Sequence, residues 1–434
     1  MLSTIIVGGG PGGLGPLVWA AQQGLLPDWL KRGIAVIERQ DHLGGTLGRF
    51  GIQSDSLGGS YLECLQAAGL PQALQAIRED PVAAEMACYA DSFPPLQLVD
   101  RFMRRLGTAM AEILGEHSAL HLGTEARSVR LRDDGAVVVE TVRDGGPARR
   151  LVAHSAVIAL GGRPFWPADD LAFGLSLGDC RVQYMMPSDQ ALSRAGLEEA
   201  NRLLGRAGGR PVVILGGSHS AYSVAGALLD LPAAAGLSPR QILILQRREP
   251  RIFYPDRAAA LADRYDVEPG DICPRTQRVN RMGGLRGYGR EMWRQITGRP
   301  RTTPEPRVAA LPIGGLSRDE LRQLIEAAAV VIPCFGYRSA TLPVFDANGR
   351  RLAFSADQDG IAVGQDSRLL LADGTALGNL FGIGLGSGYR LPASMGGEPN
   401  FDGQANSLWL YQNDIGAVIY RAIHDLLAAP AAAA

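Results

Sequence analysis

A glycine-rich run near the N-terminus has the spacing of a pyrophosphate-binding turn. The run is Gly8-Gly9-Gly10-Pro11-Gly12-Gly13, and it follows an apolar stretch at residues 4–7. In the G-x-G-x-x-G pattern, Gly8 permits a tight turn, Gly10 lets the backbone approach a pyrophosphate, and Gly13 lets the next helix pack close to the strand. The N-terminus of that helix offers unpaired N–H groups to an anion. The run, with Pro11 and Gly12 inside it, therefore predicts a dinucleotide-binding loop.

An acidic residue follows at the position where such a fold holds the adenosine ribose. A second apolar stretch, residues 33–37, ends at Glu38, and Arg39 comes next. A carboxylate at this point accepts hydrogen bonds from ribose hydroxyls. The alternative is a glycine-rich turn beside a surface glutamate. Strand, loop, helix, strand and acid in this order favour a dinucleotide site to which Glu38 and Arg39 both contribute.

A second loop of the same kind begins at Gly216, directly after the apolar residues 211–215. It reads Gly216-Gly217-Ser218-His219-Ser220-Ala221, so Ser218 and Ala221 replace the second and third glycines of the pattern. The next predicted strand, residues 241–245, is followed by Gln246-Arg247-Arg248 rather than by an acid. A carboxylate would repel a 2′-phosphate, whereas arginine binds one in a bidentate fork. This loop therefore predicts an NADPH site, unless Arg247 and Arg248 are only a solvated pair.

The composition excludes several other classes of function. The chain has 434 residues, 46% hydrophobic, and a formal net charge of -1, which removes a general electrostatic case for nucleic acid or anionic membrane as a partner. We find no signal-peptide pattern and no apolar run long enough to span a membrane, so the expected location is the cytoplasm. The five cysteines and six histidines are scattered, so neither a redox-active cysteine pair at short spacing nor a metal site is expected.

The elements around the two loops predict an α/β fold with two Rossmann-like units. Each loop has a later apolar strand that ends in glycine and proline, at residues 157–164 and 330–343. Residues 119–142 alternate between apolar and polar around Asp133-Asp134-Gly135, which is typical of a hairpin. That hairpin predicts an antiparallel β-meander inserted into the first unit.

The motifs together resemble the two-dinucleotide-binding flavoproteins, and among them the single-component flavin monooxygenases. This group includes Baeyer–Villiger monooxygenases and ornithine or lysine N-hydroxylases. Gly44-Gly45-Thr46 is similar to the G-G-T of the former, and the Gly217–Ala221 loop to the G-G-Q-S-A of the latter. Cys334-Phe335-Gly336-Tyr337 resembles their A-T-G-Y motif. The resemblance adds Gly45, Thr46, Gly336, Tyr337 and Gly384 to the expected cofactor-binding residues.

The resemblance implies FAD at the first loop, NADPH at the second, and a split FAD domain. Residues 1–195 and 350–434 would bind FAD, and residues 196–349 would form the NADPH domain. The implied activity is transfer of one oxygen atom from O2 to a small organic substrate, by N-, S- or Baeyer–Villiger-type oxygenation. A reductase or dehydrogenase with an organic acceptor, and a non-catalytic FAD-binding protein, are the alternatives. The substrate is left open, and so is the oligomeric state, including a homo-oligomer.

Gln53 and Asp55, which follow the G-G-T motif, are candidates for the catalytic site. By resemblance to N-hydroxylases, Gln53 would contact the flavin. Asp55 would hold a water or a substrate amine, or would instead cap a helix over residues 57–68. A later helix is expected over residues 404–427, with Asp402 as its cap.

One further segment, residues 275–301, is rich in arginine. It is either a solvated face or an anion-recognising lid over NADPH or an acidic substrate. Against the single acid Glu291, it contains Arg275, Arg278, Arg281, Arg286, Arg290, Arg294, Arg299 and Arg301.

Overall fold

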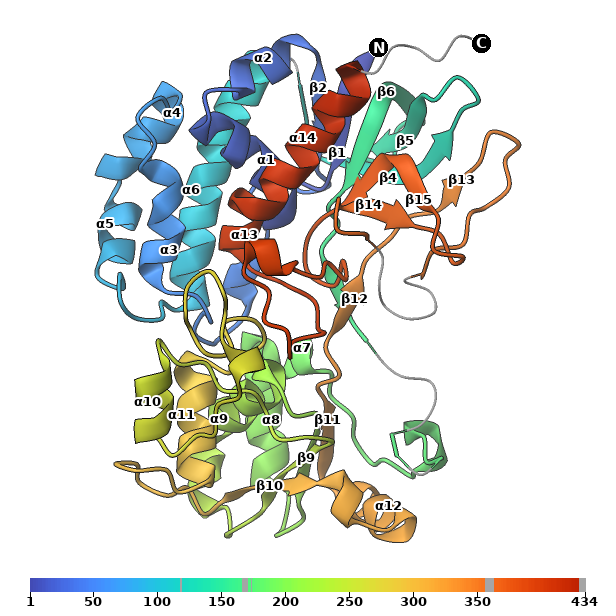
Figure 1. Cartoon of the computed structure of the whole chain (residues 1–434). Helices are drawn as coiled ribbons and strands as arrows, with labels where there is room; N and C mark the ends of the chain where they lie inside the picture. The colour runs from blue at the N-terminus through green and yellow to red at the C-terminus, as the bar shows by residue number, and fades with distance from the viewer. Residues whose placement is uncertain (118, 166–170, 173, 356–362, 429–434) are drawn as a thin grey trace.

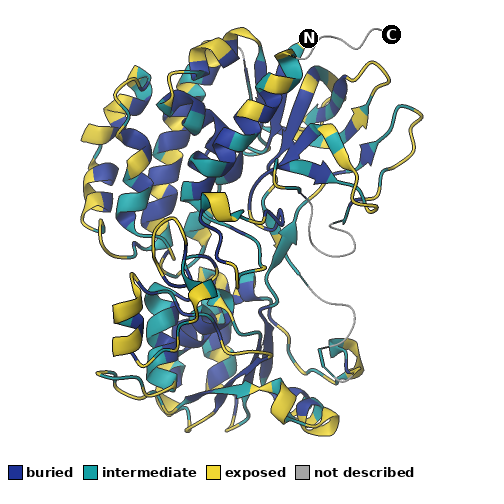
Figure 2. Cartoon of the chain, viewed as in Figure 1, coloured by how far each residue is buried: buried dark blue, intermediate teal, exposed yellow. Residues whose placement is uncertain are grey.

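The chain folds into two bodies, each built around its own β-sheet (Figure 1). The computed structural model describes residues 1–117, 119–165, 171–172, 174–355 and 363–428. In both bodies the central strands are buried, and the exposed surface lies mainly on the outer faces of the helices and on loops (Figure 2). The α/β class predicted from the sequence is confirmed. Within the described residues, no helix is long and apolar enough to cross a membrane.

The first body contains five parallel strands. In spatial order they are β3 (Leu120–His121), β2 (Ile34–Ile37), β1 (Leu2–Val7), β6 (Arg149–Ile158) and β15 (Ala376–Gly382). Val7 pairs with Ile37 on one side and with Ile158 on the other. Every residue of β2 is buried, as expected for a parallel strand covered on both faces. This arrangement brings the ends of β1, β2 and β6 together at one edge of the sheet.

Antiparallel strands extend the same sheet beyond β6. β4 (Thr124–Leu131) and β5 (Val137–Arg143) pair antiparallel around the turn at Asp133-Asp134-Gly135, and β5 pairs antiparallel with β6. At the outer edge, β13 (Val344–Phe345) runs parallel to β4. β14 (Arg368–Leu370) pairs antiparallel with β15.

Helices cover the parallel part of the first sheet. They are α1 (Pro11–Gln22), α2 (Leu26–Lys31), α3 (Gly58–Leu62), α4 (Gln72–Gln75), α5 (Pro81–Ala87), α6 (Leu96–Gly115), α13 (Leu408–Gln412) and α14 (Asp414–Ala428). In α6, Leu98, Phe102, Met103, Leu106 and Met110 are buried at the spacing of one helical face. The C-terminal helices α13 and α14 pack against α1, so the two ends of the chain share one core.

The second body has a four-stranded parallel sheet. Its strands, in spatial order, are β10 (Val308–Pro312), β9 (Ile242–Gln246), β8 (Val212–Leu215) and β11 (Val330–Pro333). Its helices are α7 (Ser188–Ala191), α8 (Arg194–Gly205), α9 (His219–Leu229), α10 (Arg257–Ala262), α11 (Gly287–Ile296) and α12 (Arg318–Ala327). Leu175, Met186 and Ala191, which precede α8, belong to the cores around this sheet.

Two kinds of connection join the bodies. The short strands β7 (Gly162–Pro164) and β12 (Tyr337–Ser339) pair antiparallel where the chain passes between them (Figure 1). The loop before α11 also docks on the C-terminal part of the first body. There Arg275 pairs with Asp414 at 3.0 Å, and the backbone N–H of Met282 donates to Glu398 Oε1 at 3.1 Å.

The single helix expected over residues 404–427 is wrong. The helical region begins only at Leu408, so Asp402 does not cap it, and it is broken between α13 and α14 at Asn413, with φ −130° and ψ −98°. The break coincides with close backbone packing. A Cβ added to Gly15 of α1 or to Gly416 of α14 would lie 2.4 Å or 2.6 Å from the carbonyl oxygen of Tyr411.

Candidate active site

The first glycine loop leaves the start of α1 free for an anion. Gly10 precedes the helix, no side chain caps it, and its first turn contains no acidic residue. The first N–H groups of a helix have no partner within the helix and carry partial positive charge. The start of α1 therefore has the chemistry that binds a pyrophosphate.

The three glycines of this loop are glycine for different reasons. Gly8 has φ +105°, and a Cβ on it would lie 2.4 Å from the carbonyl oxygen of Ala159. A Cβ on Gly13 would lie 1.8 Å from the carbonyl oxygen of Gly8. At Gly10 the only neighbour within 4 Å is the Cα of Gly45, at 3.9 Å. Protein atoms require glycine at positions 8 and 13, whereas the space beside Gly10 is open.

Glu38 is held directly against the loop. Its carboxylate accepts hydrogen bonds from the backbone N–H of Gly9 at 2.7 Å and of Gln40 at 2.8 Å. Each carboxylate oxygen has further lone pairs, so the group can still accept from ribose hydroxyls. The side chain of Arg39 is exposed beside it.

Two more glycines flank the first loop. Gly45 has φ +86°, and a Cβ on it would meet the ring of Pro11 at 2.9 Å. Gly384 has φ +118°, and a Cβ on Gly12 would lie 3.2 Å from its Cα. Thr46 follows Gly45 and is exposed. Segments distant in sequence thus border the predicted FAD phosphate site.

The second loop repeats the geometry of the first. Gly216 has φ +132°, and a Cβ on it would lie 2.4 Å from the carbonyl oxygen of Cys334, just as Gly8 packs against Ala159. Ser218 precedes α9, which begins at His219 without a side-chain cap and has no acid in its first turn. The second loop therefore has the backbone geometry and the free helix N-terminus that suit a second dinucleotide. Ser220 and Ala221 lie in that first turn.

Gln246 occupies the position in the second body that Glu38 occupies in the first. Glu38 lies 3.3 Å from a Cβ built on Gly9, and Gln246 lies 2.7 Å from one built on Gly217. The position is therefore neutral, as the sequence predicts. Arg247 and Arg248 follow it on the surface, and neither has a carboxylate within 4.0 Å among the described residues.

Asp55 lies where the two bodies meet. Burial raises the pKa of Tyr61 and Tyr411, and the charge of Asp55 raises both further. In the second body, burial lowers the pKa of His219 and of Arg286, and Asp55 opposes both shifts. One exposed carboxylate thus acts electrostatically on groups from both sides of the junction.

Asp55 was expected either to hold a water or a substrate amine or to cap the next helix. The next helix begins without a cap from Asp55. α3 begins at Gly58 after Leu57, and no side chain caps it. Asp55 therefore remains available at the junction. Gln53 is also exposed, and its backbone forms an isolated antiparallel bridge with Pro95.

Gly336 and Tyr337 lie at the crossing between the bodies. Gly336 has φ +86°, and no atom lies within 4 Å of a Cβ placed on it. Tyr337 is half-buried, and its carbonyl oxygen accepts from Gln404 Nε2 at 3.2 Å. This links β12 to the C-terminal loop of the first body.

The comparisons with known proteins identify the family. No family model matches the chain. A CMP-5'-(3-aminopropyl)phosphonate hydroxylase from Streptomyces rubellomurinus is 31% identical over 430 residues, which is 97% of each chain. The chain belongs to the single-component FAD- and NADPH-dependent flavin monooxygenases.

Solved structures share the fold of this monooxygenase. An ornithine N-hydroxylase from Kutzneria sp. 744 is 14% identical, with a TM-score of 0.54 over 98% of this chain and 99% of its own. An L-lysine 6-monooxygenase from Pseudomonas syringae is also 14% identical, with a TM-score of 0.56 over 98% of this chain and 100% of its own. As the sequence predicts, the enzyme uses FAD, NADPH and O2 to transfer one oxygen atom to a small organic substrate.

Several residues at the junction were not among those selected from the sequence. Tyr61 and Tyr411 look like ordinary core aromatics, and no spacing in the chain relates them to Asp55. Arg286 belongs to the arginine-rich segment. The arginine content of that segment singled it out, but did not show where in the fold Arg286 would lie. His219 was expected at the NADPH loop. It also contacts the arginine-rich segment, because its Nε2 is hydrogen-bonded to the carbonyl oxygen of Gly284 at 2.9 Å.

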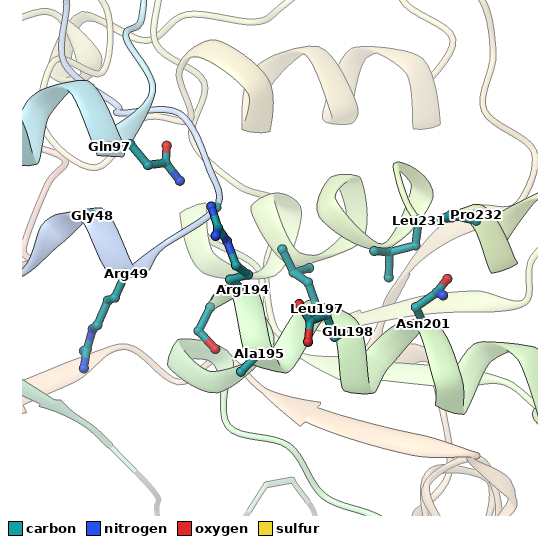
Figure 3. A pocket seen from close by; sticks show the side chains of 12 residues that line it. Gly48, Arg49, Gln97, Arg194, Ala195, Leu197, Glu198, Asn201, Leu231 and Pro232 are labelled. Carbon is teal, nitrogen blue, oxygen red and sulfur yellow. The ribbon is translucent and has the colours of Figure 1, made fainter.

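A separate groove lies between the bodies of the monooxygenase, beside α8. It has a volume of about 760 Å³, and Figure 3 shows side chains from both bodies along it, including Gln97, Arg194 and Leu197. Asp55 and the glycines of the two loops do not line it. The groove is therefore distinct from the junction around Asp55.

Arg247 and Arg248 should set the preference for NADPH over NADH. Changing both to Gln is expected to raise the KM for NADPH about 10- to 100-fold, because a charge-assisted contact to the 2′-phosphate is lost. The KM for NADH, which lacks that phosphate, should not change. Steady-state rates with each nucleotide test this, with Arg240→Gln, at the other end of β9, as the matched control. An equal effect on both nucleotides would show that Arg247 and Arg248 do not bind the 2′-phosphate of NADPH.

Proposed function

We propose that this monooxygenase hydroxylates the nitrogen of a primary amine. The observation that carries the proposal is the carboxylate of Asp55 at the junction, where it influences Tyr61, His219 and Arg286. A carboxylate pairs with the ammonium group of an amine, whereas a ketone or a sulfide has no charge for it to hold. The substrate in the name of the Streptomyces rubellomurinus hydroxylase also contains an aminopropyl group.

The neighbouring groups support binding of a cation by Asp55. Because burial lowers the pKa of His219, its ring is neutral near pH 7 and does not compete for the carboxylate. Tyr61 and Tyr411 keep their protons because burial raises the pKa of each. The Tyr61 hydroxyl is hydrogen-bonded to Ser54 Oγ at 2.6 Å, which fixes its orientation. His219, Tyr61 and Tyr411 therefore add no charge that would compete with an ammonium for the carboxylate.

Bound FAD, once reduced by NADPH, supplies the oxygen-transfer chemistry. The part left to the protein is to orient the amine and to accept its proton, because only the neutral nitrogen is a nucleophile. Asp55 is exposed, so the proton can pass from the ammonium through it to solvent. We therefore give Asp55 the role of ammonium binding and proton acceptance, and Gln53 a contact with the flavin.

The same proposal includes the domain boundaries and the cofactor contacts. We infer two Rossmann-like domains, with residues 1–195 and 350–434 for FAD and residues 196–349 for NADPH, except that Leu175, Met186 and Ala191 pack with the second sheet and β13 with the first. The antiparallel layer of β4 and β5 would be the insertion in the first. FAD would contact both flanking glycines, Gly45 and Gly384, as well as the first loop. A cytoplasmic location and a homo-oligomer stay predictions.

The test is the mass of the product formed with labelled O2. Purified enzyme with FAD and NADPH is offered a primary amine, a sulfide and a ketone of similar size, each in a separate reaction. We expect one labelled oxygen atom on the amine nitrogen and none in the other two products. A reaction without NADPH is the control. Label only in the sulfide or the ketone, or in no product at all, would contradict amine hydroxylation.

A further inference from the structure

A short stretch of the first body, residues 398–401, contacts the loop before α11 in the second body at several points. We call this stretch the docking segment. Its first residue, Glu398, is 3% exposed, and its Oε1 accepts a hydrogen bond from the backbone N–H of Met282 at 3.1 Å. A buried carboxylate of one body thus binds the backbone of the other.

Asn400 makes three hydrogen bonds to a single turn of that loop. Its Nδ2 donates to Glu268 Oε2 at 3.0 Å and to Asp271 Oδ1 at 3.1 Å. Its backbone N–H donates to the carbonyl oxygen of Gly270 at 3.0 Å. A Cβ built on Gly270 would lie 2.4 Å from Oδ1 of Asn400, which shows how closely the two residues pack. Both side-chain acceptors are carboxylates, so these hydrogen bonds are charge-assisted.

The turn that receives Asn400 is held in shape by its own body. Residues 269–271 form a 3-10 turn, and the side chains of Glu268 and Asp271 cap its ends reciprocally. Arg251 pairs with Asp271 Oδ1 at 3.4 Å, and the Asp271 carbonyl oxygen accepts from the backbone N–H of Asn280 at 2.8 Å. The acceptors for Asn400 are therefore positioned by contacts that do not involve the docking segment.

Phe401 adds an apolar contact beside these hydrogen bonds. Gly283, with φ +73°, packs on its ring, and a Cβ on that glycine would lie 2.3 Å from a ring carbon. The guanidinium carbon of Arg251 lies 5.9 Å from the centre of the same ring. A larger residue at position 283 would therefore push the docking segment away from the loop.

The arginine-rich segment contributes further contacts between the same two bodies. Arg275 pairs with Asp414 at 3.0 Å, and Arg281 donates to the carbonyl oxygen of Met395 at 3.3 Å. Both guanidinium groups lie over the ring of Trp409, at 6.0 and 5.8 Å from its centre. Part of this segment therefore joins the bodies, a role that its composition did not predict.

We propose that the docking segment positions the two bodies for hydride transfer from NADPH to FAD, with Asn400 and Phe401 as positioning residues. The inference rests on the proposed assignment of FAD to the first body and NADPH to the second. The step moves one hydride, which is two electrons and a proton, and leaves NADP+ and the anionic reduced flavin. A misplacement of reacting groups by about 1 Å can slow a reaction about 100-fold. Contacts that fix the two bodies relative to each other therefore set the rate of this step.

Anaerobic rapid mixing tests the role in hydride transfer. The FAD-loaded enzyme is reduced either by saturating NADPH or by dithionite, a small reductant that needs no nucleotide site. Asn400→Asp places a third carboxylate beside Glu268 and Asp271, and repulsion between like charges should weaken docking. We expect the variant to be reduced about 10- to 100-fold more slowly by NADPH and at the wild-type rate by dithionite.

Hydrogen exchange of the flavin-free protein tests docking without either cofactor. The backbone N–H groups of Met282 and Asn400 both donate across the interface. Peptides containing them should be protected in the wild-type protein and should exchange at least about 10-fold faster in Asn400→Asp and in Phe401→Ala. Asn400 is exposed, so its variant should keep the wild-type melting temperature within a few degrees. Asn348→Ala, which changes an exposed asparagine elsewhere, is the control and should alter neither readout.

Three results would overturn the inference. They are reduction of Asn400→Asp by NADPH at the wild-type rate, rapid exchange of both amides in the wild-type protein, and an equal loss of rate with dithionite, which would indicate damage to the flavin site. If NADPH fails to reduce even the wild-type enzyme, the positioning role falls together with the assignment of the cofactors to the two bodies. Neither measurement involves an amine, so a failure of amine hydroxylation alone would contradict only the proposed function.

Discussion

Replacing Gly10 by valine is expected to leave the apoprotein folded and to abolish FAD binding. Among the described residues, a Cβ at this position has one neighbour within 4 Å, the Cα of Gly45 at 3.9 Å, so the protein leaves room where the side chain begins. It would occupy the space through which the loop backbone approaches the pyrophosphate. The flavin absorbance per mole of purified protein should fall to background, while the melting temperature of the flavin-free protein should stay within a few degrees of wild type.

Two matched variants distinguish loss of the ligand from loss of the fold. Gly13→Ala places a Cβ 1.8 Å from the carbonyl oxygen of Gly8, so it should lower the melting temperature of the apoprotein as well as flavin content. Gly115→Ala, at the end of α6 with no atom within 4 Å, should retain both flavin and stability. Full flavin content in Gly10→Val would show that the pyrophosphate does not bind at this loop.

Replacing Asp55 by asparagine is expected to lower kcat/KM for primary amines about 10- to 100-fold, the usual worth of a hydrogen bond to a charged group. The variant keeps the size of the side chain and removes the charge that acts on Tyr61, Tyr411, His219 and Arg286. The KM for NADPH should not change, because the second glycine loop is untouched. NADPH oxidation and hydroxylated product are measured together, and we expect more NADPH to be consumed per product.

Asp133→Asn is the control for this variant, because it removes another exposed carboxylate, from the turn between β4 and β5. Asp55→Glu keeps the charge and should recover part of the activity. An Asp55→Asn enzyme with wild-type kcat/KM for amines would show that the carboxylate does not hold the substrate, and the amine proposal would then lose its main support.

The dinucleotide loops could be predicted because their requirements are local. Gly8 and Gly216 have positive φ and pack against the carbonyl oxygens of Ala159 and Cys334, so no other residue fits either position without strain. The residue at the end of the next strand, Glu38 directly after β2 and Gln246 as the last residue of β9, then lies at the loop because parallel strands end at the same edge. Spacing along the chain is enough to find loops of this geometry.

Helix boundaries near the C-terminus were not predictable in the same way. The apolar pattern of residues 404–427 suits one helix, and the low helix propensity of a single Asn at position 413 is too small an effect to require a break. The break goes with the packing of Gly15 and Gly416 on the carbonyl oxygen of Tyr411, a contact between segments almost 400 residues apart. Tertiary packing outweighed local preference there.

The sequence by itself therefore determined the α/β class, the two glycine loops and the difference in charge between Glu38 and Gln246 beside them, because each depends on backbone geometry within one strand–loop–helix unit. Only the tertiary structure decided that Asp55, His219 and Arg286 lie within electrostatic reach of one another. They lie on different loops, and their approach depends on how β7 and β12 cross between the bodies and how the loop before α11 docks on residues 395–398. Such contacts join residues far apart in the chain, and no local spacing encodes them.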